Sequence, residues 1–152
     1  MNRQALIDRI SNAFCVEPDY LWSKSSDAAV FRHAVSQKWF GLLMSVSSQS
    51  LRIPGDARID ILNVKCDPLL NGSLGQRPGF FPAYHMNKEL WISIILNEVS
   101  DDDVMELVCS SYDLTSSTKD HNNATQPITK AQNYHELDRH CVPKRKLEDL
   151  LI

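Results

Sequence analysis

The sequence lacks several features that would assign it to a particular class of protein. None of its apolar runs approaches the ~18 residues that a membrane-spanning helix needs, so we expect no membrane partner. Its first residues mix polar and apolar side chains without the apolar stretch of a secretory signal, and we expect a cytoplasmic protein. The GxSxG, HExxH and phosphate-loop motifs are missing. We therefore expect a binding module rather than an enzyme.

Cysteine is sparse and scattered. The four cysteines are Cys15, Cys66, Cys109 and Cys141, and no two of them form a CxxC pair. Closely spaced pairs are typical of zinc sites and redox sites. We therefore expect reduced, mostly buried thiols and no cofactor.

Positive charge is also limited. The net charge of the 152 residues is −3, with 16 basic and 19 acidic residues. Six of the basic and five of the acidic residues follow Thr115, which leaves ten basic and fourteen acidic residues in the body. Proteins that bind nucleic acid are usually basic. Any contact with phosphate must therefore come from a local patch of the body rather than from its overall field.

Two hydrophobic periodicities predict the fold. Helical spacing predicts a helix over 2–14, and Ser100 followed by three aspartates marks the start of a second helix. Alternating apolar residues predict strands over 38–46, 58–66 and 90–96. The order helix, strands, helix predicts an α+β domain with an antiparallel sheet. Its N-terminal and C-terminal helices are expected to cover one face of that sheet.

Weaker patterns fill the intervals between these elements. Residues 30–35 and 51–53 are compatible with short strands. Asp67 and Pro68 end a strand and are compatible with the start of a short helix or turn. Residues 71–82 contain three glycines and two prolines, which predict a loop.

The composition changes after Thr115. We expect a domain over 1–115, followed by a tail over 116–152. Residues 116–132 are polar and poor in apolar side chains, which is typical of a linker. Residues 143–152 are compatible with a short helix that docks through its leucines.

The residues around 82–96 pose the functional question, because a polar group directly precedes the clearest strand. Alternation would place aromatic and polar side chains on the sheet face away from the helices. The predicted contact residues are Trp39, Asn63, Lys65 and Trp91, with Tyr84, His85, Asn87 and Lys88 at the edge. Aromatic rings beside lysines suit base stacking and cation–π contacts. The alternative is that both tryptophans are covered by residues 71–82 or by the tail, and the usual burial of large aromatic side chains favours it.

His85 allows two interpretations. It is a residue type that can act as a general base or bind a metal. The alternative, which we favour, is a histidine that is hydrogen-bonded to the backbone at the start of a strand, with Asn87 closing an Asx turn. The nearby sequence offers only Glu89 as a carboxylate partner, and we expect its side chain to point away from Lys88. We therefore expect a shaped contact surface, not a catalytic centre.

Two further groups raise the question of a metal. The aspartates at 101–103 resemble a cation site, but the dipole at a helix N-terminus explains them. His135, His140 and Cys141 are possible ligands, but their spacing matches no zinc pattern. We expect no metal at either place.

Four segments of the chain resemble the YjbR/MmcQ-like family. They are KWFGLLMSV (38–46), DILNVKCDP (60–68), PGFFPAYHMNKELWISI (78–94) and SYDL (111–114), and their order and spacing match as well. The resemblance covers residues 2–114 and leaves the tail unmatched. It implies a frataxin-like (CyaY-like) α+β fold and a DNA-binding role, and it implies no enzymatic reaction. A domain that binds another protein or a small molecule remains the alternative.

Overall fold

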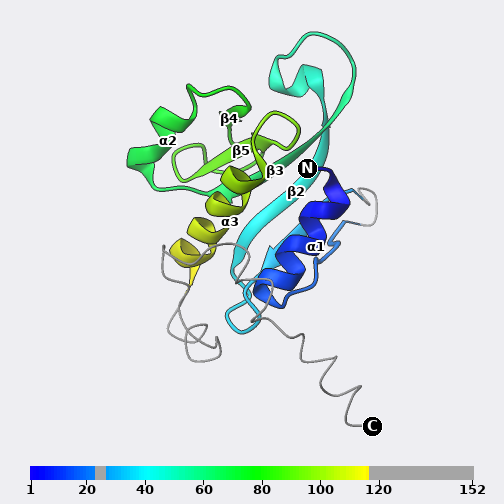
Figure 1. Ribbon diagram of the computed structural model, residues 1–152. Coiled ribbons are helices and arrows are strands. Elements are labelled where there is room, and N and C mark those ends of the chain that lie inside the picture. Colours follow the sequence, from blue (N-terminus) through cyan, green and yellow to red (C-terminus); the bar gives the residue numbers. More distant parts are fainter. Residues whose placement is uncertain (23–26, 117–152) are drawn as a thin grey trace.

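The computed structural model describes residues 1–22 and 27–116 (Figure 1). The described part forms a five-stranded antiparallel sheet with the order β1-β2-β3-β5-β4, together with three α-helices and one 3-10 helix. The elements are α1 (Arg3–Phe14), β1 (Ala29–Arg32), β2 (Trp39–Ser47), η1 (Ser48–Leu51), β3 (Arg58–Lys65), α2 (Pro68–Leu74), β4 (Phe80–Pro82), β5 (Trp91–Ile95) and α3 (Asp101–Thr115). The predicted α+β class and the antiparallel sheet are confirmed. None of the helices in the described part is long and apolar enough to cross a membrane.

Helices α1 and α3 begin and end where their sequences favour it. The side chain of Asn2 accepts a hydrogen bond from the N–H of Ala5 at 2.8 Å, and Cys15 closes α1 in a left-handed conformation. Ser100 caps α3 through the N–H of Asp103. The predicted helix over 2–14 and the predicted start near Ser100 are both confirmed.

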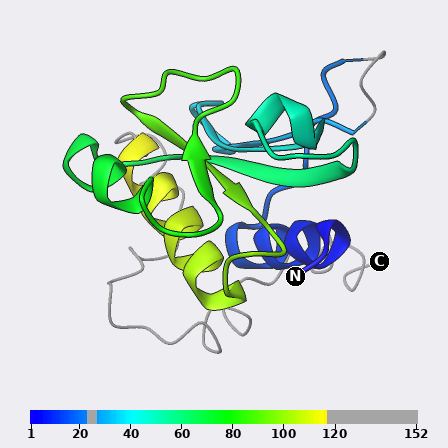
Figure 2. The same ribbon diagram turned by 90° about the horizontal axis from the view of Figure 1, so that it is seen from above.

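Both helices cover the same face of the sheet (Figure 2). Their apolar side chains pack with those of β1, β2, β3 and β5 in one continuous core. Its fully buried members include Leu6, Ile10, Phe40, Leu62, Ile92 and Val104. Because this core covers one face of the sheet, the remaining side chains of each strand point to the opposite face. The candidate contact surface lies on that opposite face.

A bulge in β2 decides which face Trp39 occupies. Phe31 of β1 lies opposite Gly41. The next residue, Arg32, lies opposite Trp39, so that Phe40 is an extra residue on β2. An extra residue shifts the alternation of side chains by one position. Phe40 therefore packs under the helices, and Trp39 shares the other face with Arg32.

The bulge also changes the positions of the residues that follow it. Strict alternation along the predicted strand 38–46 would place Leu42 and Met44 on the side of Phe40, under the helices, and the structure shows otherwise. Leu42 lies opposite Asn63, and Met44 packs in a second cluster on the far face. Leu43 takes the place under the helices. The set Leu42, Met44 and Val46 is the more apolar one, although Met44 and Val46 pack in the second cluster, so the sequence pattern pointed to the wrong face.

The far face of the sheet is covered over part of its area. A smaller cluster of Val46, Leu51, Ile61 and Ile95 lies there, and η1 contributes to it. Residues 51–53 are therefore not a strand, because Leu51 ends η1. Residues 71–82 are not purely a loop either, because α2 reaches Leu74 and β4 begins at Phe80. Predictions for the tail, including its helix and His135, His140 and Cys141, lie outside the described residues.

Candidate contact surface

Lys65 lies between the two tryptophans at one end of the sheet. On β5, Trp91 is its direct cross-strand partner. On the other side is the end of β2, where the bulge turns Trp39 to the same face. All three side chains are half-buried. Neighbouring strands lie about 4.8 Å apart, so the backbones that carry the two tryptophans lie about 10 Å apart, with the backbone of Lys65 between them.

A serine from α3 holds this end of the sheet in shape. The hydroxyl of Ser111 accepts a hydrogen bond from the N–H of Lys65 at 2.8 Å and donates one to the carbonyl of Phe40 at 2.7 Å. It is fully buried and bridges β2 and β3 beside the bulge. Helix α3 thereby fixes the backbone that carries Lys65 and Trp39.

Trp39 has further aromatic and cationic neighbours that the sequence analysis did not identify. The ring of Trp22 meets it edge-on, with centroids 6.1 Å apart, and the guanidinium of Arg32 lies 5.8 Å from its ring centroid. Arg32 also forms a 3.2 Å ion pair with Asp19. Trp22 is 42% exposed. The sequence signal for this neighbour was the run of three consecutive apolar residues at 20–22. All three are exposed in the structure.

Asn63 lies on the expected face, but it is fully buried. Its side-chain nitrogen donates to the carbonyl of Tyr84 at 3.0 Å, and its side-chain oxygen accepts from the hydroxyl of Ser93. That hydroxyl in turn accepts from the N–H of Tyr84 at 2.9 Å. Asn63 and Ser93 are cross-strand partners, and together they satisfy both backbone groups of Tyr84. Asn63 therefore positions a loop and does not offer a free side chain to a ligand, which corrects its predicted place at the surface.

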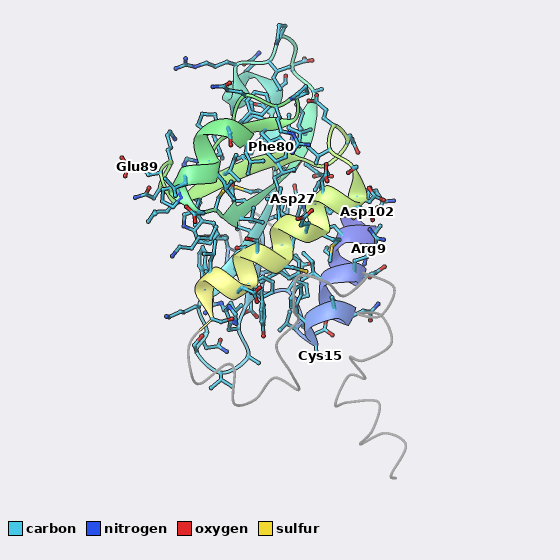
Figure 3. The ribbon with its side chains drawn as sticks, turned by 60° about the vertical axis from the view of Figure 1, so that its left-hand side comes forward. Arg9, Cys15, Asp27, Phe80, Glu89 and Asp102 are labelled. Atoms are coloured by element: carbon cyan, nitrogen blue, oxygen red, sulfur yellow. The ribbon has the colours of Figure 1, made fainter. Side chains whose placement is uncertain are left out.

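The loop between β4 and β5 presents the remaining predicted residues. Asn87 accepts hydrogen bonds from the N–H groups of Glu89 and Leu90, so the predicted Asx turn is confirmed. Lys88 donates to the carbonyl of Ala83 at 3.0 Å and closes the loop. Glu89 lies at the surface beside α2 (Figure 3).

His85 is exposed and adopts a left-handed backbone conformation with a φ of 59°. Its ring centroid lies 4.1 Å from that of Tyr84. Within residues 1–22 and 27–116 its side chain forms no hydrogen bond or ion pair, so the predicted hydrogen bond to the backbone is wrong. A general base needs a partner that orients it, so this geometry offers no acid–base pair.

One asparagine that the sequence analysis placed in a loop joins α2 to the same turn. The side-chain nitrogen of Asn71 lies 3.1 Å from each of three carbonyl oxygens, those of Lys88, Glu89 and Trp91. An asparagine beside a glycine within a helix is unfavourable for the helix. Once residues 68–74 are assigned to a helix, the presence of this unfavourable asparagine suggests that its side chain contacts another part of the protein.

The thiols of Cys66 and Cys109 are poorly suited to nucleophilic chemistry. Burial raises the pKa of Cys109 to about 11, with smaller contributions from Asp113 and Glu106. Burial and the nearby Asp67 also raise the pKa of Cys66. Both thiols are therefore protonated at neutral pH, and a protonated thiol is a weak nucleophile.

The acidic side chains likewise form no ligand set within the described ranges. No three His, Cys, Asp or Glu side chains are grouped there so that they could hold a metal ion. Asp101 forms an ion pair with the amino group of Met1 at 2.8 Å, and Asp103 forms one with Arg77 at 3.2 Å. These two aspartates are compensated by cations and by the helix dipole.

Comparison with known proteins identifies the family. The YjbR family model matches residues 14–114, which is most of the part that the structure describes. The chain belongs to the YjbR family. The resemblance of the four sequence segments to this family is thereby confirmed. A family member from Bacillus subtilis, the uncharacterized protein YyaQ, is 35% identical over 116 residues, which are 76% of this chain and 98% of YyaQ.

Solved structures show a similar fold. A Pseudomonas syringae protein is similar in its crystal structure, with a TM-score of 0.75, 43% identity, and coverage of 76% of this chain and 100% of that one. A solution structure of a P. syringae protein gives a TM-score of 0.71 at 42% identity, covering 78% of this chain and 95% of that one. Deinococcus radiodurans DR2400 shares the fold, with a TM-score of 0.58 at 19% identity over 82% of this chain and 91% of that one.

Proposed function

We propose that this YjbR-family protein is a non-enzymatic binding module whose leading ligand is nucleic acid. The observation that carries the proposal is Lys65 between the half-buried rings of Trp39 and Trp91. Nucleic-acid bases stack on aromatic rings of this kind, and an adjacent lysine attracts the phosphate backbone. His85 has no acid–base partner among the described residues, and the thiols of Cys66 and Cys109 are protonated at neutral pH, which favours binding over catalysis.

The surface favours single strands over a duplex. Stacking requires an unpaired base face, and a duplex hides its base faces. Exposed or half-exposed lysines near the surface are few, namely Lys38, Lys65 and Lys88. A duplex carries a dense array of phosphates, and these three lysines would neutralise few of them.

The test is a fluorescence-anisotropy titration of labelled single-stranded and double-stranded DNA at two salt concentrations. We expect single strands to bind more tightly, with an affinity that falls as salt rises. Trp91→Ala and Trp39→Ala should each weaken binding about tenfold or more, the order expected for loss of one stacked base. Arg52→Ala is the control, because Arg52 is exposed beyond η1 at the opposite end of β2. No binding of either DNA at low salt would contradict the proposal.

A protein partner is the second candidate, and exposed apolar residues support it. Leu69 and Leu70 of α2 are 88% and 55% exposed, and Leu90 is 37% exposed. Exposed leucines at one end of a domain are typical of a docking surface. Binding through these residues should be insensitive to salt and should disappear in Leu69→Ser. The salt series therefore separates the two candidates.

We also propose the finer description of the domain that the resemblance implies. It is a frataxin-like (CyaY-like) domain over 1–115, followed by a separate tail over 116–152. The α+β order of the described elements supports the first part. The free thiols of Cys15, Cys66 and Cys109 support a reducing compartment such as the cytoplasm. Removal of 116–152 should leave a domain that melts cooperatively, and loss of that transition would show that the tail belongs to the core.

A further inference from the structure

Helix α2 is held in place with little help from hydrophobic burial. None of its seven residues is fully buried, and Leu69 is 88% exposed. Leu74 alone among its apolar residues packs partly against the main core. Short helices of this kind owe most of their stability to packing against the rest of the protein. Polar contacts must therefore contribute to fixing α2 on the domain.

Asn71 supplies those contacts. Its side-chain amide faces the carbonyl oxygens of Lys88, Glu89 and Trp91, each at 3.1 Å. The amide nitrogen must point toward them, because the amide oxygen would repel three carbonyls. Two N–H bonds are thus shared among three acceptors, so the turn and α2 are held against each other.

The rest of the turn is held by its own segment and by one backbone bond to the residue after β3. The side chain of Asn87 accepts from the N–H groups of Glu89 and Leu90, and its carbonyl accepts from the N–H of Trp91. The carbonyl of Leu90 accepts from the N–H of Cys66 at 2.8 Å, and Asn71 satisfies the carbonyls of Lys88, Glu89 and Trp91. Asn71 is therefore the side chain from another element that fixes the backbone between Lys88 and Trp91.

We infer that Asn71 is a positioning residue for the nucleic-acid surface, and that α2 is the brace through which it acts. This inference rests on the proposed function, because Trp91 and Lys88 are the contact residues whose backbone Asn71 holds. Asn71 need not touch the ligand. A preorganised loop loses less conformational entropy on binding than a mobile one, and affinity rises accordingly.

The test uses Asn71→Asp in the full-length protein. Aspartate has the same shape but no N–H donors, and its carboxylate would face three carbonyl oxygens. We expect faster hydrogen exchange at the amides of Glu89, Leu90 and Trp91 without ligand, and about tenfold weaker binding of single-stranded DNA. Asn97→Asp is the matched control, because it adds the same charge at an exposed site beyond the other end of β5. It should change neither quantity.

A double-mutant cycle separates positioning from general destabilisation. The effect of Asn71→Asp on affinity should largely vanish in a Lys88→Ala, Trp91→Ala background, because the positioned groups are then missing. It should persist in a Trp39→Ala background, since Trp39 lies on β2. Equal effects in both backgrounds would overturn the inference.

The remaining outcomes distinguish this inference from the proposed function. Unchanged exchange at residues 89–91 in Asn71→Asp would overturn the positioning role whether or not DNA binds. Faster exchange with wild-type affinity would overturn it as well. Failure of the wild-type protein to bind DNA would instead overturn the proposed function, and it would be seen before any variant is made.

Discussion

The two faces of the sheet are closed in different ways. The face under α1 and α3 is sealed by a continuous apolar core. The far face has a smaller apolar cluster under η1, then the buried pair Asn63 and Ser93, and finally the half-open row of Trp39, Lys65 and Trp91. Along the far face, buried apolar side chains thus give way first to buried, hydrogen-bonded polar side chains and then to partly exposed ones. The first face stabilises the fold, and the open end of the second is available for contact with a ligand.

The largest expected effect tests whether the core under α1 and α3 provides most of the free energy of unfolding. Phe40 is fully buried, and its ring lies within 5.3 Å of those of Phe14, His33 and Tyr112. Phe40→Ala should lower the free energy of unfolding by about 3–5 kcal/mol, because it removes contacts and leaves a cavity. Urea denaturation measures this loss. Trp91→Ala, at the open end, should cost clearly less, and equal losses would contradict the division between the faces.

The next effect concerns the junction between the two faces. Ser111→Ala would leave the N–H of Lys65 and the carbonyl of Phe40 without their buried partner. We expect a loss of about 2 kcal/mol in the free energy of unfolding, since an unsatisfied buried group costs roughly 1–3 kcal/mol. Ser110→Ala is the matched control, because the neighbouring serine is exposed. Equal stability of the two variants would show that Ser111 does not bridge the strands.

Phe40 and Ser111 also show what the sequence can and cannot reveal. The helices over 2–14 and from Ser100 were predictable, because caps and apolar spacing are local signals. The bulge at Phe40 was not, because Leu42, Met44 and Val46 are the more apolar set, although Met44 and Val46 pack in the second cluster on the far face. The role of Ser111 was not predictable either, since its partners lie 46 and 71 positions away in the chain.

The candidate site was predictable in composition but not in the division of roles. Alternation correctly paired Trp91 with Lys65 on one face, and Trp91 is half-buried. It could not show that Asn63 is buried, because the loop that covers Asn63 comes from Tyr84, 21 residues later. It also could not identify Asn71, whose acceptors lie 17 to 20 residues away. Contacts of this kind depend on how the elements pack together, which local patterns do not encode.

The pH dependence of the unfolding free energy tests how deeply Cys109 is buried in the helix layer. The pKa of Cys109 on α3 is raised to about 11, mainly by burial. The folded state therefore holds the thiol proton more tightly than the unfolded state, whose thiol titrates near pH 9. Stability is unaffected below pH 9 and falls as the pH rises from about 9 to 11. The difference in unfolding free energy between wild type and Cys109→Ala should shift by about 1–2 kcal/mol over that range, because each pKa unit corresponds to about 1.4 kcal/mol. A constant difference would contradict this burial.

The smallest expected effect lies at the open end, where stability and contact should oppose each other. His85 has a φ of 59°, a conformation that glycine adopts without the steric cost that a side chain carries. His85→Gly should therefore raise the free energy of unfolding by about 0.5–1 kcal/mol, even though the glycine chain gains entropy when unfolded. The same variant removes the ring beside Tyr84, so binding of single-stranded DNA should weaken while the protein becomes more stable. His85→Asn separates the two effects, because asparagine tolerates the left-handed conformation but lacks the imidazole. Thermal melting and the anisotropy titration measure the two quantities on the same samples. A destabilised His85→Gly would mean that the contact with Tyr84 holds the loop, and His85 would then belong to the structural part of the far face rather than to its contact surface.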